Sequence, residues 1–125
     1  METKIHLVKQ FTDLEVWKKA FEISLEVHRQ SLNFPKIEQY AMGDQIRRAS
    51  KSICANIAEG FVKQKKSKAE FKRFLQMALG SSNEMLVWIL YCKELSYVSE
   101  EDARRWYNEY LSICKMLNTL HGNSK

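Results

Sequence analysis

The chain contains few residues that interrupt helices: one proline and four glycines in 125 positions. These two residues are the least favourable inside a helix, so their scarcity predicts long helices joined by short loops. Long hydrophobic runs are also absent. The longest, Met85 to Leu90, falls far short of the roughly 20 residues that span a bilayer. Because residues 1–10 carry charged side chains and no apolar leader, we expect a cytoplasmic protein without membrane contact.

Cysteine and histidine are scarce, and neither is spaced for chemistry. The cysteines, at positions 54, 92 and 114, are odd in number and far apart, so we expect buried thiols and no disulfide framework. The three histidines have no ligand-forming partners at helical spacing, and no glycine-rich phosphate loop is present. His28 lies on an apolar stripe of the first expected helix, and this position favours a packed core side chain. We therefore predict a protein that is not an enzyme and binds no metal or cofactor.

Apolar periodicity predicts an all-α chain with four helices. Short loops between amphipathic helices are typical of an antiparallel up-down bundle, here a single domain over residues 1–125 with tails at 1–10 and 122–125. The expected helices lie near residues 14–33, 44–60, 67–95 and 99–121.

Four residues are expected to set the helix ends. Asp13 is placed to cap the first helix, and Gly60 is a typical C-terminal stop for the second. Ser67 begins a capping-box sequence that ends at Glu70, and Ser99 begins a similar acidic start for the fourth helix.

The first expected helix has two apolar stripes, which together cover about 200° of its circumference. One core-facing side does not need so wide an arc. We place the first stripe in the core, and we expect the second to meet another subunit. The first stripe comprises Leu14, Trp17, Phe21, Leu25, His28 and Leu32, and the second comprises Val16, Ala20, Ile23 and Val27.

Positive charge is concentrated in the middle of the chain. Residues 36–73 carry ten basic and four acidic side chains, whereas the whole chain has a net charge of +5. Two interpretations are open: a surface that contacts nucleic-acid phosphates, or an ordinary solvated loop. The candidate nucleic-acid-binding residues are Arg47, Lys51, Lys63, Lys65, Lys66, Lys68 and Lys72.

Other residues of the second and third helices are candidates for contacts between helices or subunits. Arg48 is expected to pair with Glu59 or Glu84, although contact with nucleic acid is an alternative. Ala55 and Ala58 either let another backbone approach closely or are simply good helix formers.

Several segments resemble one bacterial family of four-helix bundles, encoded by intervening sequences inside 23S ribosomal RNA genes and often labelled S23 ribosomal protein. The resemblance covers nearly the whole chain. The segments are Phe11-x-Asp13-Leu14-x-Val16-Trp17, Phe34-Pro35, Tyr40, Gln45-Ile46-Arg47-Arg48-Ala49, Asn56-Ile57-Ala58-Glu59-Gly60, Phe74-Leu75 and Ala78-x-Gly80-Ser81-x-x-Glu84.

The resemblance implies a left-handed bundle that forms a ring, typically a homopentamer. It also implies kinship with the accessory variability proteins of diversity-generating retroelements, which work with a reverse transcriptase and nucleic acid. We therefore expect a self-associating bundle that binds RNA or DNA through its basic segment. The alternative is a scaffold for a polymerase-type protein, without direct nucleic-acid contact.

Overall fold

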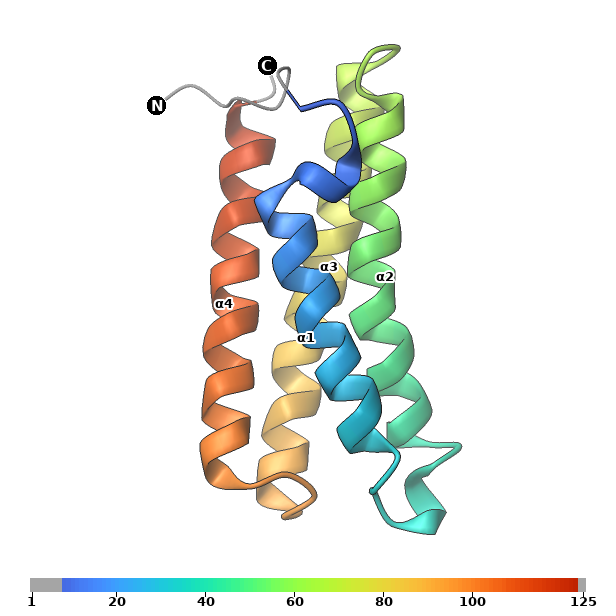
Figure 1. The fold of residues 1–125 in the computed structure, drawn as a ribbon, viewed down its shortest axis with the longest axis vertical. Coiled ribbons are helices and arrows are strands. Elements are labelled where there is room, and N and C mark those ends of the chain that lie inside the picture. The colour runs from blue at the N-terminus through green and yellow to red at the C-terminus, as the bar shows by residue number, and fades with distance from the viewer. Residues whose placement is uncertain (1–7, 124–125) are drawn as a thin grey trace.

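The computed structural model describes residues 8–123, in which every regular element is helical. Four long helices lie side by side, and each runs in the opposite direction to the one before it (Figure 1). Short 3-10 helices precede α1 and α2. The elements are η2 (Phe11–Asp13), α1 (Glu15–Ser31), η3 (Lys36–Glu38), α2 (Met42–Lys63), α3 (Lys68–Glu94) and α4 (Glu100–Asn123).

One apolar stripe from each helix fills the centre of the bundle. The buried residues recur at three- and four-residue spacing, which places them on one side of each helix. In α2 they are Ile46, Ala49, Ile53 and Ile57. In α3 and α4 they include Phe71, Leu75, Ala78, Met85, Ile89, Ala103, Trp106, Tyr110, Ile113 and Leu117.

The two stripes of α1 have the opposite roles to those predicted. Val16, Ala20, Ile23 and Val27 are buried within the single chain, at 0–5% exposure, so they are not available to another subunit. Members of the stripe assigned to the core face outward instead: Phe21, Leu25 and Leu32 are exposed, and Trp17 and His28 are half-buried. The smaller β-branched residues and alanine allow α1 to approach its neighbours closely, and the bulky residues take the outer arc.

The helix ends confirm two of the predicted caps. The Ser67 hydroxyl accepts a hydrogen bond from the Glu70 backbone N–H at 3.2 Å. The Ser99 hydroxyl accepts one from the Asp102 N–H at 3.1 Å. Asp13 was wrongly assigned, because it belongs to η2 and α1 begins after Leu14 without a side-chain cap.

Gly60 does not end α2, contrary to the prediction. The helix continues to Lys63, and Gly60 is buried against α3. A Cβ at this position would lie 3.1 Å from the Cβ of Phe74. The glycine therefore serves close helix packing, and its lack of a side chain is what permits it.

The predicted tails lie partly outside the described residues, which exclude 1–7 and 124–125. No described helix is long and apolar enough to cross a membrane.

Candidate nucleic-acid interface

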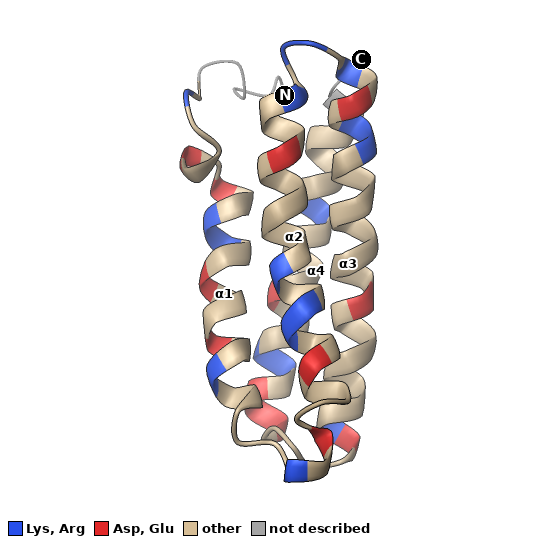
Figure 2. Cartoon of the chain, turned by 90° about the vertical axis from the view of Figure 1, so that its right-hand side faces the viewer, with Lys and Arg blue, Asp and Glu red and all other residues tan. Residues whose placement is uncertain are grey.

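Five lysines surround the turn between α2 and α3, at one end of the bundle (Figure 2). We call this set the basic end. Three of its lysines are exposed and two are half-buried. The start of α3 adds the positive end of the helix dipole, which also favours anions. The basic end consists of Lys63, Lys65, Lys66, Lys68 and Lys72.

Glu70, the one acidic residue in the segment 61–73, is already paired. Glu70 accepts hydrogen bonds from both Nε and Nη2 of Arg73, at 3.0 and 3.1 Å. These bonds hold the pKa of Glu70 below its ordinary value. The Arg73 guanidinium also lies over the Phe74 ring, 4.6 Å from its centroid. Arg73 thus neutralises Glu70, and the lysines around them supply the net charge of this end.

Arg47 is one of the residues predicted to bind nucleic acid. In the structure it holds the connector between α1 and α2. Its guanidinium donates to the Ser31 hydroxyl at 2.8 Å and to the Gln39 carbonyl at 2.6 Å. Gln39 in turn donates to the Ser31 carbonyl at 2.9 Å, which satisfies the C-terminal end of α1. The structure therefore gives Arg47 a structural role at the end of the bundle opposite the basic end.

Lys51 lies apart from the basic end as well. Its ammonium is 2.8 Å from Nδ1 of His28. Twelve residues separate Lys51 from Lys63 along α2, a rise of about 18 Å. Burial lowers the pKa of His28, and the charge of Lys51 lowers it further. The seven residues predicted to bind nucleic acid consequently do not form one surface, although the five at the basic end do.

The predicted pairing of Arg48 is wrong within the chain. Arg48 lies 3.5 Å from Asp44, one turn earlier on α2. Glu84 accepts a hydrogen bond from the Trp88 indole N–H at 2.8 Å, also within its own helix. Glu59 is exposed. Contact of these side chains with another subunit stays a prediction.

The two alanines on the outer side of α2 differ in exposure. Ala55 is exposed, whereas Ala58 is half-buried. Neither position has a large side chain, so another backbone can approach here. Their predicted role in an interface between subunits stays a prediction.

Sequence reasoning missed a polar network between α1 and α4. Glu26 receives a bidentate ion pair from Arg105 and a hydrogen bond from the Trp106 indole N–H at 2.7 Å. Asp102 belongs to the same network, because its carboxylate accepts hydrogen bonds from Arg105 at 3.0 Å and from the Gln30 side chain at 3.1 Å. The hydrogen bonds from Arg105 lower the pKa values of both carboxylates. No local pattern could have revealed these contacts, because the partners are about 80 positions apart in the chain.

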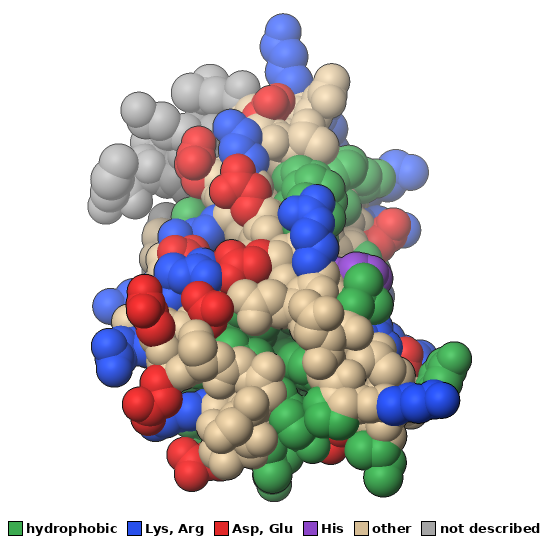
Figure 3. Space-filling view, turned by 60° about the horizontal axis from the view of Figure 1, so that its bottom comes forward, with side chains coloured by type: hydrophobic (Ala, Val, Ile, Leu, Met, Phe, Trp, Pro, Cys, Tyr) green, Lys and Arg blue, Asp and Glu red, His purple; other side chains and the backbone are tan. Residues whose placement is uncertain are grey.

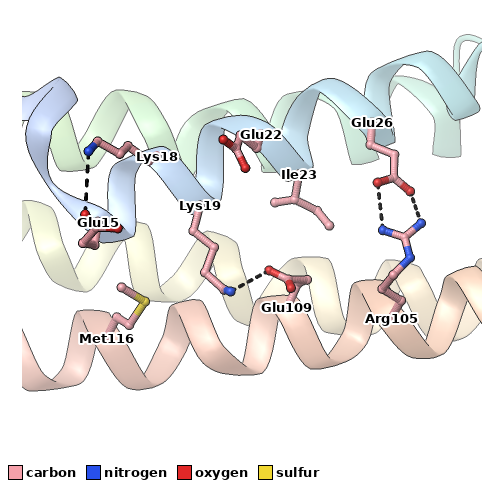
Figure 4. Close-up of a pocket in the computed structure, with 9 residues that line it drawn as sticks. All are labelled: Glu15, Lys18, Lys19, Glu22, Ile23, Glu26, Arg105, Glu109 and Met116. Atoms are coloured by element: carbon pink, nitrogen blue, oxygen red, sulfur yellow. Dashed lines mark hydrogen bonds and ion pairs between the residues drawn. The ribbon is translucent and has the colours of Figure 1, made fainter.

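This network borders a groove of about 510 Å³ between α1 and α4 (Figure 4). A second ion pair crosses the groove, from Lys19 to Glu109 at 2.9 Å. Lys18 and Glu15 pair along α1 at 3.6 Å. The groove therefore presents alternating, mutually paired charges, with Glu22 as the remaining acidic side chain. Such a lining neutralises itself and lacks the excess of one sign that binds a charged ligand.

The cysteines are not poised for reaction. Burial raises the pKa of Cys54 to about 11 and that of Cys92 to about 12, and it also raises the pKa of Cys114. The thiolate is the reactive form, and it is scarce at neutral pH for such groups. Among residues 8–123 no three His, Cys, Asp or Glu side chains are grouped to hold a metal ion.

These features define a helical bundle with one strongly basic end. A model of the family described as "23S rRNA-intervening sequence protein" matches residues 12–119. The chain therefore belongs to this family, as the sequence resemblance predicted.

Solved structures are similar too. A protein of unknown function from the S23 ribosomal protein family of Bacteroides thetaiotaomicron VPI-5482 superposes with a TM-score of 0.76 and is 27% identical in sequence. The match covers 86% of this chain and 95% of that one. A search of curated proteins finds no match.

Proposed function

We propose that this protein is a non-enzymatic, oligomeric bundle that binds nucleic acid, RNA in particular, through its basic end. One observation carries the proposal. Residues 61–73 contain six Lys and Arg against one Glu, a net of +5 that equals the net charge of the whole chain. All of the excess charge is therefore concentrated at one end of the bundle, where it attracts a polyanion.

The chemistry of the basic end favours contact with phosphates over contact with bases. Lysine ammonium groups and helix N-termini bind phosphate oxygens without regard to sequence. Single-strand readers add exposed aromatic rings on which bases stack. The phenylalanines around the basic end offer no exposed ring: Phe71 is buried, Phe61 and Phe74 are half-buried, and Arg73 covers Phe74. We therefore expect binding that depends little on RNA sequence.

Self-association is the second part of the proposal. We propose that the antiparallel bundle is left-handed and that copies of it close into a ring, with a pentamer as the expected size. Support comes from large apolar side chains that one chain leaves exposed, because such residues in clusters mark interfaces. They include Phe21, Leu25 and Leu32 on α1, and Met77, Val87, Leu90, Tyr91 and Leu95 on α3.

The same exposed side chains support an alternative function. An apolar helix face can hold a partner protein, such as a reverse transcriptase, without any contact between this chain and nucleic acid. The two functions differ in one measurable property, because only direct phosphate contact makes RNA affinity depend on the lysines of the basic end.

Fluorescence anisotropy with a short RNA across a salt series tests the proposal. We expect log affinity to fall with log salt with a slope of about −3 to −4, as for four or five neutralised phosphates. Replacing Lys65, Lys66 and Lys72 by Gln reduces the magnitude of that slope by about 2 to 3.

A matched control removes three charges at the opposite end: Arg29→Gln, Arg48→Gln and Lys93→Gln. This variant keeps nearly the wild-type slope if the basic end is the binding surface. Equal losses in the two triple variants mean that net charge alone drives binding. If the wild-type protein binds no RNA even at low salt, the scaffold function replaces this one.

A further inference from the structure

The connector between α1 and α2 is fixed by hydrogen bonds, yet it exposes two large apolar side chains. Ile37 is 84% exposed and Tyr40 is 97% exposed. The backbone around them is held by Gln39, whose side chain bonds the Ser31 carbonyl at 2.9 Å, and by Arg47, which bonds the Gln39 carbonyl at 2.6 Å. A segment that is already ordered loses little conformational entropy when it docks.

A small groove between α3 and α4 has complementary properties. Its volume is about 220 Å³, below the roughly 300 Å³ at which ligand pockets begin. It therefore suits one or two protruding side chains better than a small molecule. Ile89 and Ala103 are buried and form its floor, whereas its polar side chains are exposed and form its rim. The lining comprises Ile89, Leu90, Ala103 and Tyr107, with Lys93, Glu100, Arg104 and Asn108 around them.

The connector and the groove lie at the same end of the bundle, on opposite sides. Each helix packs beside two others: α1 contacts α2 and α4, and α3 also contacts α2 and α4. The α1–α2 edge is therefore opposite the α3–α4 edge. Both the connector and the α3–α4 turn are at the lower end in Figure 1, and Figure 3 shows apolar side chains gathered at that end. The groove is thus beyond the reach of its own connector.

Each surface carries charges of both signs, and one oppositely charged pair, Lys36 on the connector and Glu100 on the groove, can meet between copies; Lys93 and Arg104 are cations on the same rim. Lys36 precedes Ile37 on the connector, and Glu100 lies on the rim of the groove. Neither side chain forms an ion pair with a residue in the described range 8–123. Rim charges of opposite sign guide association and fix its register.

We propose that Ile37 and Tyr40 of one copy dock into the α3–α4 groove of a second copy. The proposal rests on the self-association proposed above and specifies its surfaces. The contact is head-to-tail, so each copy uses one connector and one groove, and a ring forms when the rotation between copies closes. The basic end stays free on every subunit, so the assembly would display one set of lysines per copy.

A mixing experiment followed by light scattering tests this contact. The connector variant carries Ile37→Ser and Tyr40→Ser, and the groove variant carries Leu90→Glu, a change at a half-exposed position. We expect each variant alone to associate at least about tenfold more weakly than wild type, because aromatic anchors dominate interfaces. Mixed together, they pair through the one intact connector and one intact groove. The product is a dimer of twice 14.7 kDa that cannot grow further.

Charge exchange provides a second measurement. Lys36→Glu and Glu100→Lys each weaken self-association, and the two changes in one chain restore it. Val62→Ser is the matched control for the connector variant, because Val62 is also an exposed apolar residue but lies on α2 near the basic end.

Two results overturn the docking contact. One is wild-type association of the connector variant, which would leave the proposed self-association intact but on other surfaces. The other is a monomeric wild-type protein, which would remove self-association as well. RNA affinity is measured separately, so neither result is confused with failure of the basic end.

Discussion

Trp106 donates its indole N–H to Glu26 across the α1–α4 interface at 2.7 Å, and the indole itself is fully buried. Trp106 is the largest core side chain of α4, and this bond gives its buried polar N–H an acceptor. Glu26 is only half-buried, so its carboxylate can bond the buried indole and still meet Arg105 at the surface. This arrangement links the core to the α1–α4 groove.

Removal of the Glu26 carboxylate therefore destabilises the fold. We expect Glu26→Ala to lower the free energy of unfolding by about 2–3 kcal/mol, mostly because the Trp106 N–H loses its buried acceptor. Glu26→Gln keeps an acceptor oxygen and costs about 1 kcal/mol or less, since the ion pair with Arg105 is partly exposed to solvent. Urea melts measure both values, with Glu22→Ala as the control in the same groove. Equal costs for Ala and Gln would show that the charge matters and the indole bond does not.

Acid weakens the protein in two pH ranges. Glu26 and Asp102 have folded pKa values below their ordinary 4.5 and 3.8, because Arg105 hydrogen-bonds both carboxylates. Their stabilisation is present above the unfolded values and is lost as pH falls through the folded ones. His28 has a folded pKa below its ordinary 6.5, because burial and Lys51 disfavour the cation. The unfolded state therefore binds more protons just below pH 6.5, and stability declines there as pH falls.

His28→Gln separates the two ranges. The variant should lose the decline just below pH 6.5 and keep the decline at lower pH, which belongs to the carboxylates. Urea midpoints at several pH values between 8 and 3 would check this. A wild-type midpoint that is flat from pH 8 to 5 would contradict the assignment to His28.

Tyr110 has a buried hydroxyl with no hydrogen-bond partner among the described residues. Burial raises the pKa of this phenol, so it stays neutral. An unsatisfied buried donor costs about 1–3 kcal/mol, and Tyr110→Phe removes only that oxygen. We expect the variant to be more stable than wild type by about 1 kcal/mol, read from thermal and urea melts. A loss of stability would mean that the hydroxyl is bonded in solution.

The sequence was sufficient to predict the four helices, because apolar periodicity and the scarcity of glycine and proline mark them. It was not sufficient for α1, where two stripes of similar hydrophobicity compete. Which stripe is buried depends on how closely α2 and α4 approach, and Ala20 and Val27 allow the closer approach. Trp17 is consequently half-buried against Phe21, with the ring centroids 4.7 Å apart, instead of lying in the core.

The candidate site was predicted only in part, for a similar reason. Lysines close together in the chain necessarily lie close together in space, so the basic end was visible in the sequence. The roles of Arg47 and Lys51 depend on α1, because Arg47 reaches Ser31 and Lys51 reaches His28. Charge alone does not distinguish a side chain that waits for a ligand from one that bonds a neighbouring helix.

Two glycines inside helices should respond to alanine in opposite directions. Gly80 is exposed in α3, and no atom outside its own helix segment lies within 4 Å of an added Cβ. Gly80→Ala should therefore stabilise the protein by about 0.5–1 kcal/mol, the usual gain in helix propensity. Gly60→Ala would bring the same gain in helix propensity. Its added Cβ, however, would lie 3.1 Å from the Phe74 Cβ and 3.4 Å from the Phe71 carbonyl oxygen.

These atoms belong to the body of α3 rather than to the tip of a flexible side chain, so α2 and α3 must separate to admit the methyl group. Overpacking of a close helix contact costs about 1–3 kcal/mol, which outweighs the gain in propensity. We therefore expect Gly60→Ala to destabilise the protein by about 1 kcal/mol net, and Gly60→Leu by considerably more. Urea melts of the three variants beside wild type measure the order. If Gly60→Ala proves as stabilising as Gly80→Ala, the close approach of α2 and α3 is not the reason for glycine at position 60.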